Sequence, residues 1–140
     1  MPRLFHTMTL DERRDTLVVL GGLLRGGFAG AIHEIHDGNW RRIAPATGPE
    51  SFRNHSASWD PNTGEVLIFG GIGTGRQPLG GTWSWNGTSW TDRSPSGPVP
   101  APRFNTAMAR DVHGTLILFG GADSPTTVPF DDTWRWDGTS

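Results

Sequence analysis

The sequence predicts an all-β protein built from repeated units of short antiparallel strands. The composition favours many tight turns, since the 140 residues include 20 Gly and 11 Pro and only 34% are apolar. In addition, one apolar segment that ends in Gly-Gly occurs three times at an almost constant spacing. Seven Trp and seven Phe offset the shortage of aliphatic residues, because each aromatic side chain buries a large apolar area.

The apolar segments set the length of the repeat. They are Thr16–Gly22, Glu65–Gly71 and Thr115–Gly121, and their first glycines, at positions 21, 70 and 120, are 49 and 50 residues apart. Further landmarks keep this period: Trp40 and Trp90, Pro45 and Pro95, Arg53 and Arg103, and the segments Trp83–Ser89 and Trp134–Ser140. Several independent landmarks at one period predict a repeat architecture.

Each repeat contains four expected strands. The first covers Asn54–Trp59 and Phe104–Arg110, and its small side chains suit a crowded position. After the turns Asp60–Gly64 and Asp111–Gly114, the second strand is the apolar run, which we expect to be buried on both faces. The third strand covers Thr82–Trp85 and Thr133–Trp136, and Glu34–Gly38 is its degenerate counterpart in the first repeat. Asn86-Gly87 is a strong hairpin signal, so the fourth strand begins at Trp90 and ends near Arg93.

This unit resembles the kelch repeat. The motif consists of Val66–Gly71, then Trp83-x-Trp85, then Trp90, and the resemblance covers essentially the whole chain. It implies kelch-type β-propeller blades, four-stranded antiparallel sheets of the galactose oxidase central-domain-like superfamily. One departure is that Trp85 and Trp136 stand where kelch repeats often carry Tyr, a residue that this chain lacks.

We therefore expect a partial β-propeller over residues 1–140, an incomplete open arc of about three blades. Blade one covers 2–44, blade two 52–94 and blade three 102–140. Trp90 follows Trp85 by five residues, so the matching Trp of blade three would stand at position 141, and this blade is expected to lack its outer strand. Closed propellers contain about 4–8 blades. The remaining blades of a longer protein, or other copies of the chain, are thus needed to close the ring.

Alternating strand directions place the long loops on one face, where binding sites on rigid scaffolds are common. These loops are Gly22–Ala31, Gly71–Gly81, Gly121–Asp131, Pro45–Phe52 and Pro95–Pro102. The candidate ligand-binding residues on this face are Arg3, His6, Arg25, Arg53, His55, Arg76, Arg103 and Asn105. Guanidinium groups there suit carboxylate, phosphate or acidic peptide ligands. The alternative is that these arginines bond loop carbonyls and fix the connection between blades.

Other chemistry finds little support in the sequence. His33 and His36 point to opposite faces of a strand, so we expect no metal site there, and we expect no cofactor. The chain lacks the Tyr and Cys of the copper–radical centre of galactose oxidase, and no catalytic residues are assigned. The net charge of −2 argues against nucleic acid. The N-terminus has no signal-peptide pattern, and the apolar run Leu17–Leu20 is too short to span a membrane, so the compartment is unassigned.

The function expected from these observations is a kelch-repeat binding or scaffold module that holds a ligand, or a protein or peptide partner, on its long-loop face. Two alternatives stay open at this point. One is part of a non-redox carbohydrate-handling kelch enzyme, and the other is a structural repeat of a secreted or surface protein. We interpret the tryptophans mainly as packing between blades and not as a sugar-binding platform.

Overall fold

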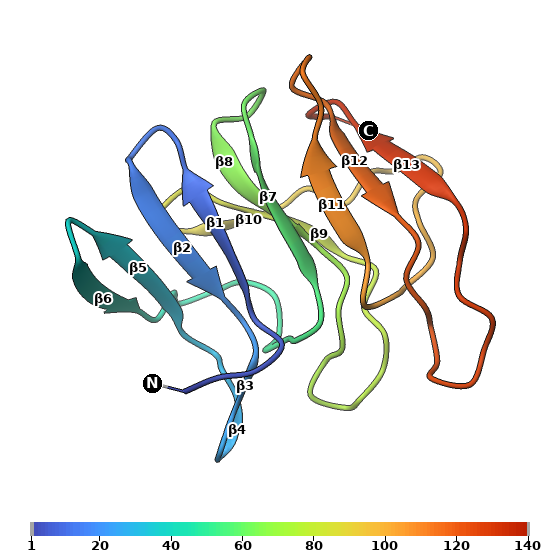
Figure 1. Cartoon of the computed structure of the whole chain (residues 1–140), viewed down its shortest axis with the longest axis horizontal. Coiled ribbons are helices and arrows are strands. Elements are labelled where there is room, and N and C mark those ends of the chain that lie inside the picture. Colours follow the sequence, from blue (N-terminus) through green and yellow to red (C-terminus); the bar gives the residue numbers. More distant parts are fainter. Residues whose placement is uncertain (1, 140) are drawn as a thin grey trace.

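A computed structural model describes residues 2–139, which form strands, turns and loops. The chain is all-β, as predicted, and its strands form three open antiparallel sheets and one small hairpin (Figure 1). The first sheet contains β1 (Thr7–Asp11), β2 (Thr16–Leu20), β5 (Ile32–His36) and β6 (Asn39–Ile43). The second contains β7 (Ser56–Asp60), β8 (Glu65–Phe69), β9 (Thr82–Trp85) and β10 (Trp90–Asp92). The third contains β11 (Ala107–Arg110), β12 (Leu116–Phe119) and β13 (Thr133–Trp136), and the hairpin is β3 (Leu23–Leu24) with β4 (Gly27–Phe28). Within residues 2–139, no helix is available to cross a membrane.

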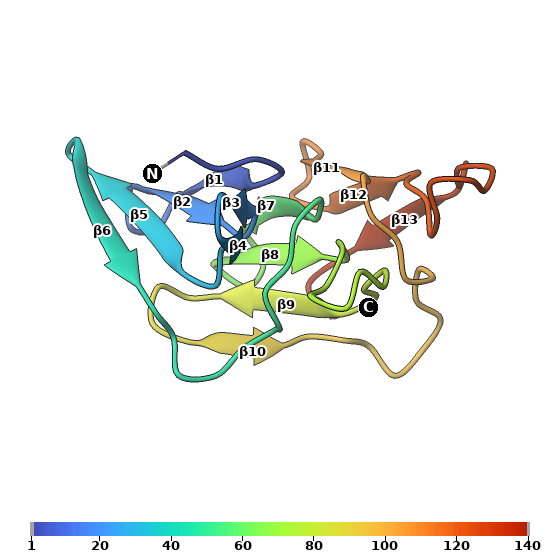
Figure 2. The same ribbon diagram turned by 90° about the horizontal axis from the view of Figure 1, so that it is seen from below.

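The three sheets stand side by side, with their first strands next to one another. β7 contacts both β1 and β11, and Figure 2 shows the later strands of each sheet fanning outward. At one end the turns that follow the first strands converge, and Arg110 of the third sheet forms an ion pair of 2.9 Å with Glu12 in a turn of the first. The long loops after β8 and β12 lie at the opposite end (Figure 1). This end is the long-loop face.

Strand register corrects one landmark of the repeat. Ser56 pairs with Phe69 and Ala107 pairs with Phe119, in each case the residue before the first glycine. The equivalent of Arg103 is therefore Phe52, whereas Arg53 corresponds to Phe104, and the expected match of Arg53 with Arg103 is wrong. The shift arises because the turn after Asp111 is one residue shorter than the turn after Asp60.

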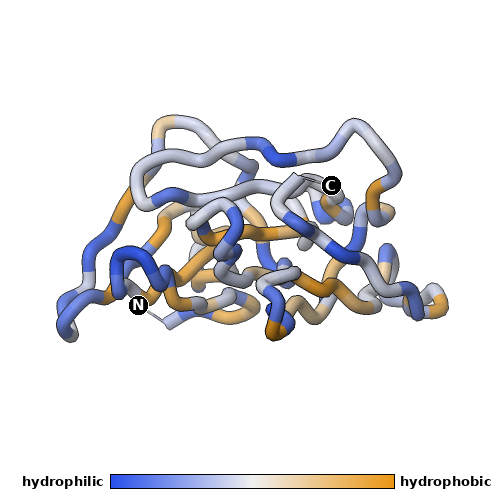
Figure 3. Tube along the Cα trace, turned by 90° about the horizontal axis from the view of Figure 1, so that it is seen from above, coloured by the Kyte–Doolittle hydropathy of each residue, from blue (hydrophilic) through white to orange (hydrophobic). Residues whose placement is uncertain are grey.

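The core lies between the sheets. Between the first and second it is built from Val18, Leu20, Ile32, Phe52, Trp59, Val66, Ile68 and Trp85. The expectation that the second strand is buried on both faces is confirmed in the middle sheet, where Val66–Phe69 are at most 3% exposed. It is wrong at the end of β12, since Phe119 is 53% exposed on a face that no described sheet covers. Figure 3 shows the apolar segments concentrated in the inner strands.

The Gly-Gly pairs let two neighbouring backbones approach the end of each second strand. A Cβ at Gly21 or Gly70 would lie 2.5 Å from the carbonyl oxygen of Phe52 or Arg103, which belongs to the next repeat. A Cβ at Gly71 would lie 2.7 Å from the carbonyl oxygen of Arg53, within its own repeat. These glycines also have positive φ angles, which side chains disfavour. The motif is therefore a junction between repeats.

Local structure differs from the sequence prediction at three places. The loop Gly22–Ala31 contains the β3–β4 hairpin, which the sequence did not predict. Asp37 and Gly38, in the degenerate segment, form a two-residue turn with φ of 48° and 75°, the signs that a type I′ hairpin requires. The hairpin predicted at Asn86-Gly87 is confirmed, but its loop has four residues, and the Asn86 side chain accepts bonds from the N–H groups of Thr88 and Ser89.

Candidate functional site

Arg53 is the centre of the candidate site on the long-loop face. Its guanidinium carbon lies 5.4 Å from the ring centroid of Phe5 and 5.8 Å from that of Phe28, both contributed by the first repeat. Nη1 donates to Oδ1 of Asn54 at 3.2 Å, while Nε is buried and has no hydrogen-bond partner among residues 2–139. Since no salt bridge to Arg53 is found in this part of the chain, its positive charge is not neutralised by a neighbouring carboxylate.

Two asparagines extend the site along the row of first strands. Asn54 and Asn105 are equivalent residues with φ of 58° and 57°, a left-handed conformation that Asn tolerates better than most side chains. The N–H of Asn54 donates to the carbonyl of Phe5, and that of Asn105 donates to the carbonyl of Asn54. Asn54 Nδ2 also donates to Asn105 Oδ1 at 2.7 Å. This left-handed residue ends the loop and explains why the first strands begin later than predicted.

His55, the residue after Asn54, is buried. Its Nε2 shares a hydrogen bond of 2.6 Å with Thr7 of the first sheet, and its ring contacts the ring of Phe52 edge-on, with centroids 4.5 Å apart. Its Nδ1 has no partner within residues 2–139. Burial, together with the nearby His6, lowers the pKa of His55 to about 3. His55 is therefore neutral and joins the two sheets, while His6 is exposed.

Arg103 differs from Arg53 because it is 1% exposed and its donors are occupied. It forms a forked ion pair with Asp132 and donates to the carbonyl oxygens of Ala101 and Gly120, each at 3.0 Å. Its guanidinium carbon lies 3.9 Å from the ring centroid of Phe130. The Arg103 bond, with help from Trp134, lowers the pKa of Asp132 to about 2. These contacts hold the loop after β12 in place and leave Arg103 little capacity for a ligand.

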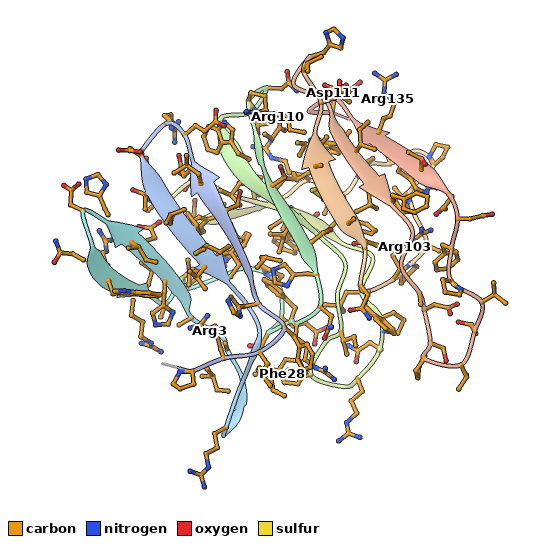
Figure 4. All side chains as sticks on the ribbon, in the orientation of Figure 1. Arg3, Phe28, Arg103, Arg110, Asp111 and Arg135 are labelled. Carbon is orange, nitrogen blue, oxygen red and sulfur yellow. The ribbon has the colours of Figure 1, made fainter. Side chains whose placement is uncertain are left out.

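The other predicted residues do not join the Arg53 cluster. Arg3 donates to the carbonyl of Gly21 at 3.2 Å and to Nδ1 of His33 at 2.7 Å. Like Arg103, it therefore forms its hydrogen bonds within its own repeat. Burial lowers the pKa of Arg3. Arg25 and Arg76 are exposed in separate loops. Figure 4 shows Arg3, Phe28 and Arg103 towards the long-loop face, with Arg110, Asp111 and Arg135 at the opposite end.

A second polar cluster joins the sheets at the turn end. Arg14 pairs with Asp11 at 2.6 Å and with Glu34 at 2.7 Å, and Glu34 accepts a bond from the indole N–H of Trp85. Arg14 lies against Gly87, where a side chain would collide with the guanidinium. The acidic groups here are thus used in packing the second sheet on the first.

The segment His33–His36 forms separate contacts. His33 binds Arg3, whereas Nδ1 of His36 approaches the carbonyl oxygen of Asp15 at 2.9 Å. Burial, followed by the charge of Arg3, lowers the pKa of His33. In the part of the chain that the structure describes, no three His, Asp or Glu side chains are grouped as metal ligands would be.

No protein-family profile matches the chain. The chain is similar to dynein regulatory complex subunit 7 of Chlamydomonas reinhardtii, with 36% identity over 70 residues. This similarity covers 49% of the chain and 6% of that much longer protein. The overlap is too short to assign the chain to a family.

The residues predicted from the sequence include Arg53, His55 and Asn105 of this candidate site, but not Phe5, Phe28 or Asn54. Phe5 and Phe28 come from the first repeat, and no local pattern indicates that they lie beside an arginine of the second. The sequence did contain a signal for Asn54. An Asn stands shortly before the first strand in both the second and the third repeat, and strand register shows that these two residues, Asn54 and Asn105, are equivalent.

Proposed function

We propose that the chain forms three blades of a kelch-type β-propeller and acts as a binding module for an acidic peptide segment of a partner protein. Three features support the architecture: strands that pair in sequence order within the larger sheets, first strands that lie side by side, and glycine pairs that join successive repeats. Ring closure would use further blades, either from a longer chain or from other copies.

The observation that carries the binding proposal is the unneutralised charge of Arg53 on the long-loop face. Its guanidinium lies near the rings of Phe5 and Phe28, and Asn54 accepts a hydrogen bond from one of its donors. A guanidinium whose orientation is already restricted loses less entropy when it forms a forked bond to a carboxylate. The side chains of Asn54 and Asn105 add amide groups beside it. A glutamate or aspartate side chain with its adjoining backbone suits this arrangement.

The long loops around the site are tied together, which gives the surface a defined shape. Glu50, in the segment between the first two repeats, accepts bonds from the N–H and hydroxyl of Thr74 and from Gln77, each at 3.0 Å. Glu50 thereby links its own segment to the loop after β8. Because Glu50 is engaged in these bonds, it is not a partner of Arg53.

The test is a titration of the chain with a short glutamate-rich peptide, monitored by calorimetry, with a glutamine-rich peptide as the control ligand. The variant Arg53→Ala should weaken binding about tenfold or more, since a charged hydrogen bond contributes roughly 1.5–3 kcal/mol. Arg53→Lys should restore part of the affinity, because it keeps the charge and loses the fork. Arg76→Ala is the matched control, since Arg76 is an exposed loop arginine outside the site.

Three results would overturn the proposal: equal affinity for the two peptides, an equal loss in the Arg53→Ala and Arg76→Ala variants, or a fall in melting temperature that accounts for the loss in Arg53→Ala. Affinity should also decrease with added salt, because screening weakens contacts between exposed charges.

A further inference from the structure

A cavity of about 250 Å³ lies at the long-loop end of the second sheet. Its walls come from the segment between β6 and β7, from the end of β8, and from β9 with the residues before it. The second sheet has a neighbouring sheet on each side, and a Cβ at Gly80 would lie 3.0 Å from the ring of Pro102 in the segment that leads to the third repeat. The cavity therefore has chain on both sides and does not arise at an end of the sequence.

The other two repeats place an arginine at the position that one wall of this cavity occupies. Equivalent strand bridges in the three repeats show that Arg3, Phe52 and Arg103 correspond to one another. Arg3 and Arg103 each donate to the carbonyl oxygen of the first glycine of their own repeat, at 3.2 and 3.0 Å. In the second repeat this glycine is Gly70, which lines the cavity, and Phe52 has no donor for its carbonyl.

The third repeat shows what fills the corresponding space when the arginine is present. There the guanidinium of Arg103 forms a forked pair with Asp132 and lies over the ring of Phe130. By register, Gly81 takes the place of Asp132 in the second repeat, and Leu79 takes the place of Phe130. Gly81 and Leu79 both line the cavity. The cavity thus lies where the third repeat holds a buried guanidinium and its carboxylate.

A carboxylate also faces this cavity, although it comes from a different segment. Glu50 is among the lining residues, and its carboxylate accepts bonds only from neutral groups, the N–H and hydroxyl of Thr74 and the side-chain amide of Gln77. Within residues 2–139, no salt bridge to Glu50 is found, so its negative charge is not neutralised. The indole of Trp83 forms part of the same wall, and aromatic faces attract cations.

We propose that this cavity binds the guanidinium group of an arginine side chain from a partner peptide. The guanidinium donates to the carbonyl of Gly70, as Arg3 and Arg103 do in the other repeats, and to the carboxylate of Glu50. Arginine suits the site better than lysine, because a planar guanidinium can donate to two acceptors while it lies against an aromatic ring. The site selects the opposite charge from the Arg53 site and does not depend on binding there.

The experiment uses acetyl-arginine amide as the probe. Acetyl-citrulline amide, which has nearly the same shape and no charge, and acetyl-lysine amide are the control ligands. Binding is followed by amide-resolved NMR, in which the indole N–H of Trp83 and the backbone N–H groups of Gly70 and Gly81 report the site. We expect saturable shifts of these signals with the arginine probe. Citrulline should bind about tenfold or more weakly, since hydrogen bonds to charged groups are roughly twice as strong as neutral ones.

Two positions of the protein complete the test. Glu50→Gln should weaken arginine binding about tenfold and leave citrulline binding unchanged, because only the charge of the acceptor is removed. Asp131→Asn, at an exposed loop carboxylate, is the matched control. Gly81→Asp places a carboxylate where the third repeat has Asp132 and should tighten arginine binding several-fold, whereas Gly81→Asn should not. Gly81 has no positive φ, so neither side chain strains the backbone there.

Several outcomes would overturn the proposal. It is wrong if the arginine probe shifts none of the three reporting signals, if citrulline binds as well as arginine, or if Asp131→Asn weakens binding as much as Glu50→Gln does. It is also wrong if Gly81→Asn tightens binding as much as Gly81→Asp. The variant Arg53→Ala should leave binding of the arginine probe unchanged, and this separates the cavity from the proposed site for acidic peptides.

Discussion

Phe52 and Arg103 occupy the same position in successive repeats. The carbonyl oxygen of Phe52 accepts a hydrogen bond of 2.8 Å from the N–H of Gly22, and that of Arg103 accepts one of 2.9 Å from Gly71. Their side chains fill the position differently, since Phe52 belongs to the apolar core while Arg103 is buried in a forked pair with Asp132. One backbone junction thus accommodates either an aromatic ring or an ion pair.

The first prediction concerns this buried ion pair. Arg103→Leu should lower the free energy of unfolding by about 2 kcal/mol, because it leaves Asp132 and two loop carbonyls without their donor; the partial exposure of Asp132 keeps the loss below that of a fully buried pair. Urea unfolding followed by tryptophan fluorescence measures the change. Arg53→Leu is the control and should change stability by less than about 0.5 kcal/mol. Equal losses in the two variants would contradict the different roles assigned to these arginines.

The second prediction concerns acid stability. The folded pKa of Asp132, about 2, lies below its ordinary value of 3.8, so its contribution to stability is complete above pH 3.8 and is lost as the pH falls towards 2. The variant Asp132→Asn should therefore be less stable than the parent above this window and should show a flatter pH dependence within it. Thermal melts at a series of pH values provide the measurement, and parallel curves for the two proteins would rule out this role.

The third prediction concerns His55, which affects stability over a higher pH range than Asp132 does. Since its folded pKa of about 3 lies below the ordinary 6.5, the unfolded chain takes up a proton that the folded chain does not, and stability falls as the pH drops from 6.5 to 3. The slope should reach about 1.4 kcal/mol per pH unit. His55→Gln should remove it, whereas His113→Gln, at an exposed turn residue, should leave it in place. An unchanged slope in His55→Gln would show that another group is responsible.

The fourth prediction uses two glycines that share the same backbone angle. Gly70 and Gly120 both have φ of 69°, so alanine imposes the same backbone strain at each. A Cβ at Gly70 would lie 2.5 Å from the carbonyl of Arg103, whereas at Gly120 the nearest atom is 3.3 Å away. Gly70→Ala should therefore lower the free energy of unfolding more than Gly120→Ala does. Gly120→Ala should lower it by about 1–2 kcal/mol, from backbone strain alone. If urea unfolding shows equal losses of unfolding free energy in the two variants, the backbone at this junction between repeats must shift easily to make room for the added methyl group.

The sequence was informative about strands and turns because these depend on local chemistry. The apolar run before each Gly-Gly, the paired tryptophans of the third strand and the Asn86-Gly87 turn all lie in the predicted elements. The lengths of the turns caused the main error. Asp60 and Gly64 enclose one residue more than Asp111 and Gly114, so a fixed period of fifty residues aligns Arg53 with the wrong residue of the next repeat.

The candidate site was harder to predict because its members meet across repeats. Arginines at a regular spacing had two interpretations, a binding ring or structural ties to loop carbonyls, and Arg3 and Arg103 form ties of the second kind. What distinguishes Arg103 is Asp132, which lies 29 residues away in the sequence. Among residues 2–139, no such carboxylate lies beside Arg53. The position of a distant acidic side chain is not encoded in local patterns.

The hydrogen bonds that run from Phe5 to Asn54 and from Asn54 to Asn105 connect the sheets in series, and this has a consequence for unfolding. The middle sheet is supported on both faces, while each outer sheet has one neighbour among the described residues, so local opening should begin at the ends and proceed inward. Amide exchange should accordingly be slowest in β8 and become faster towards both ends of the array.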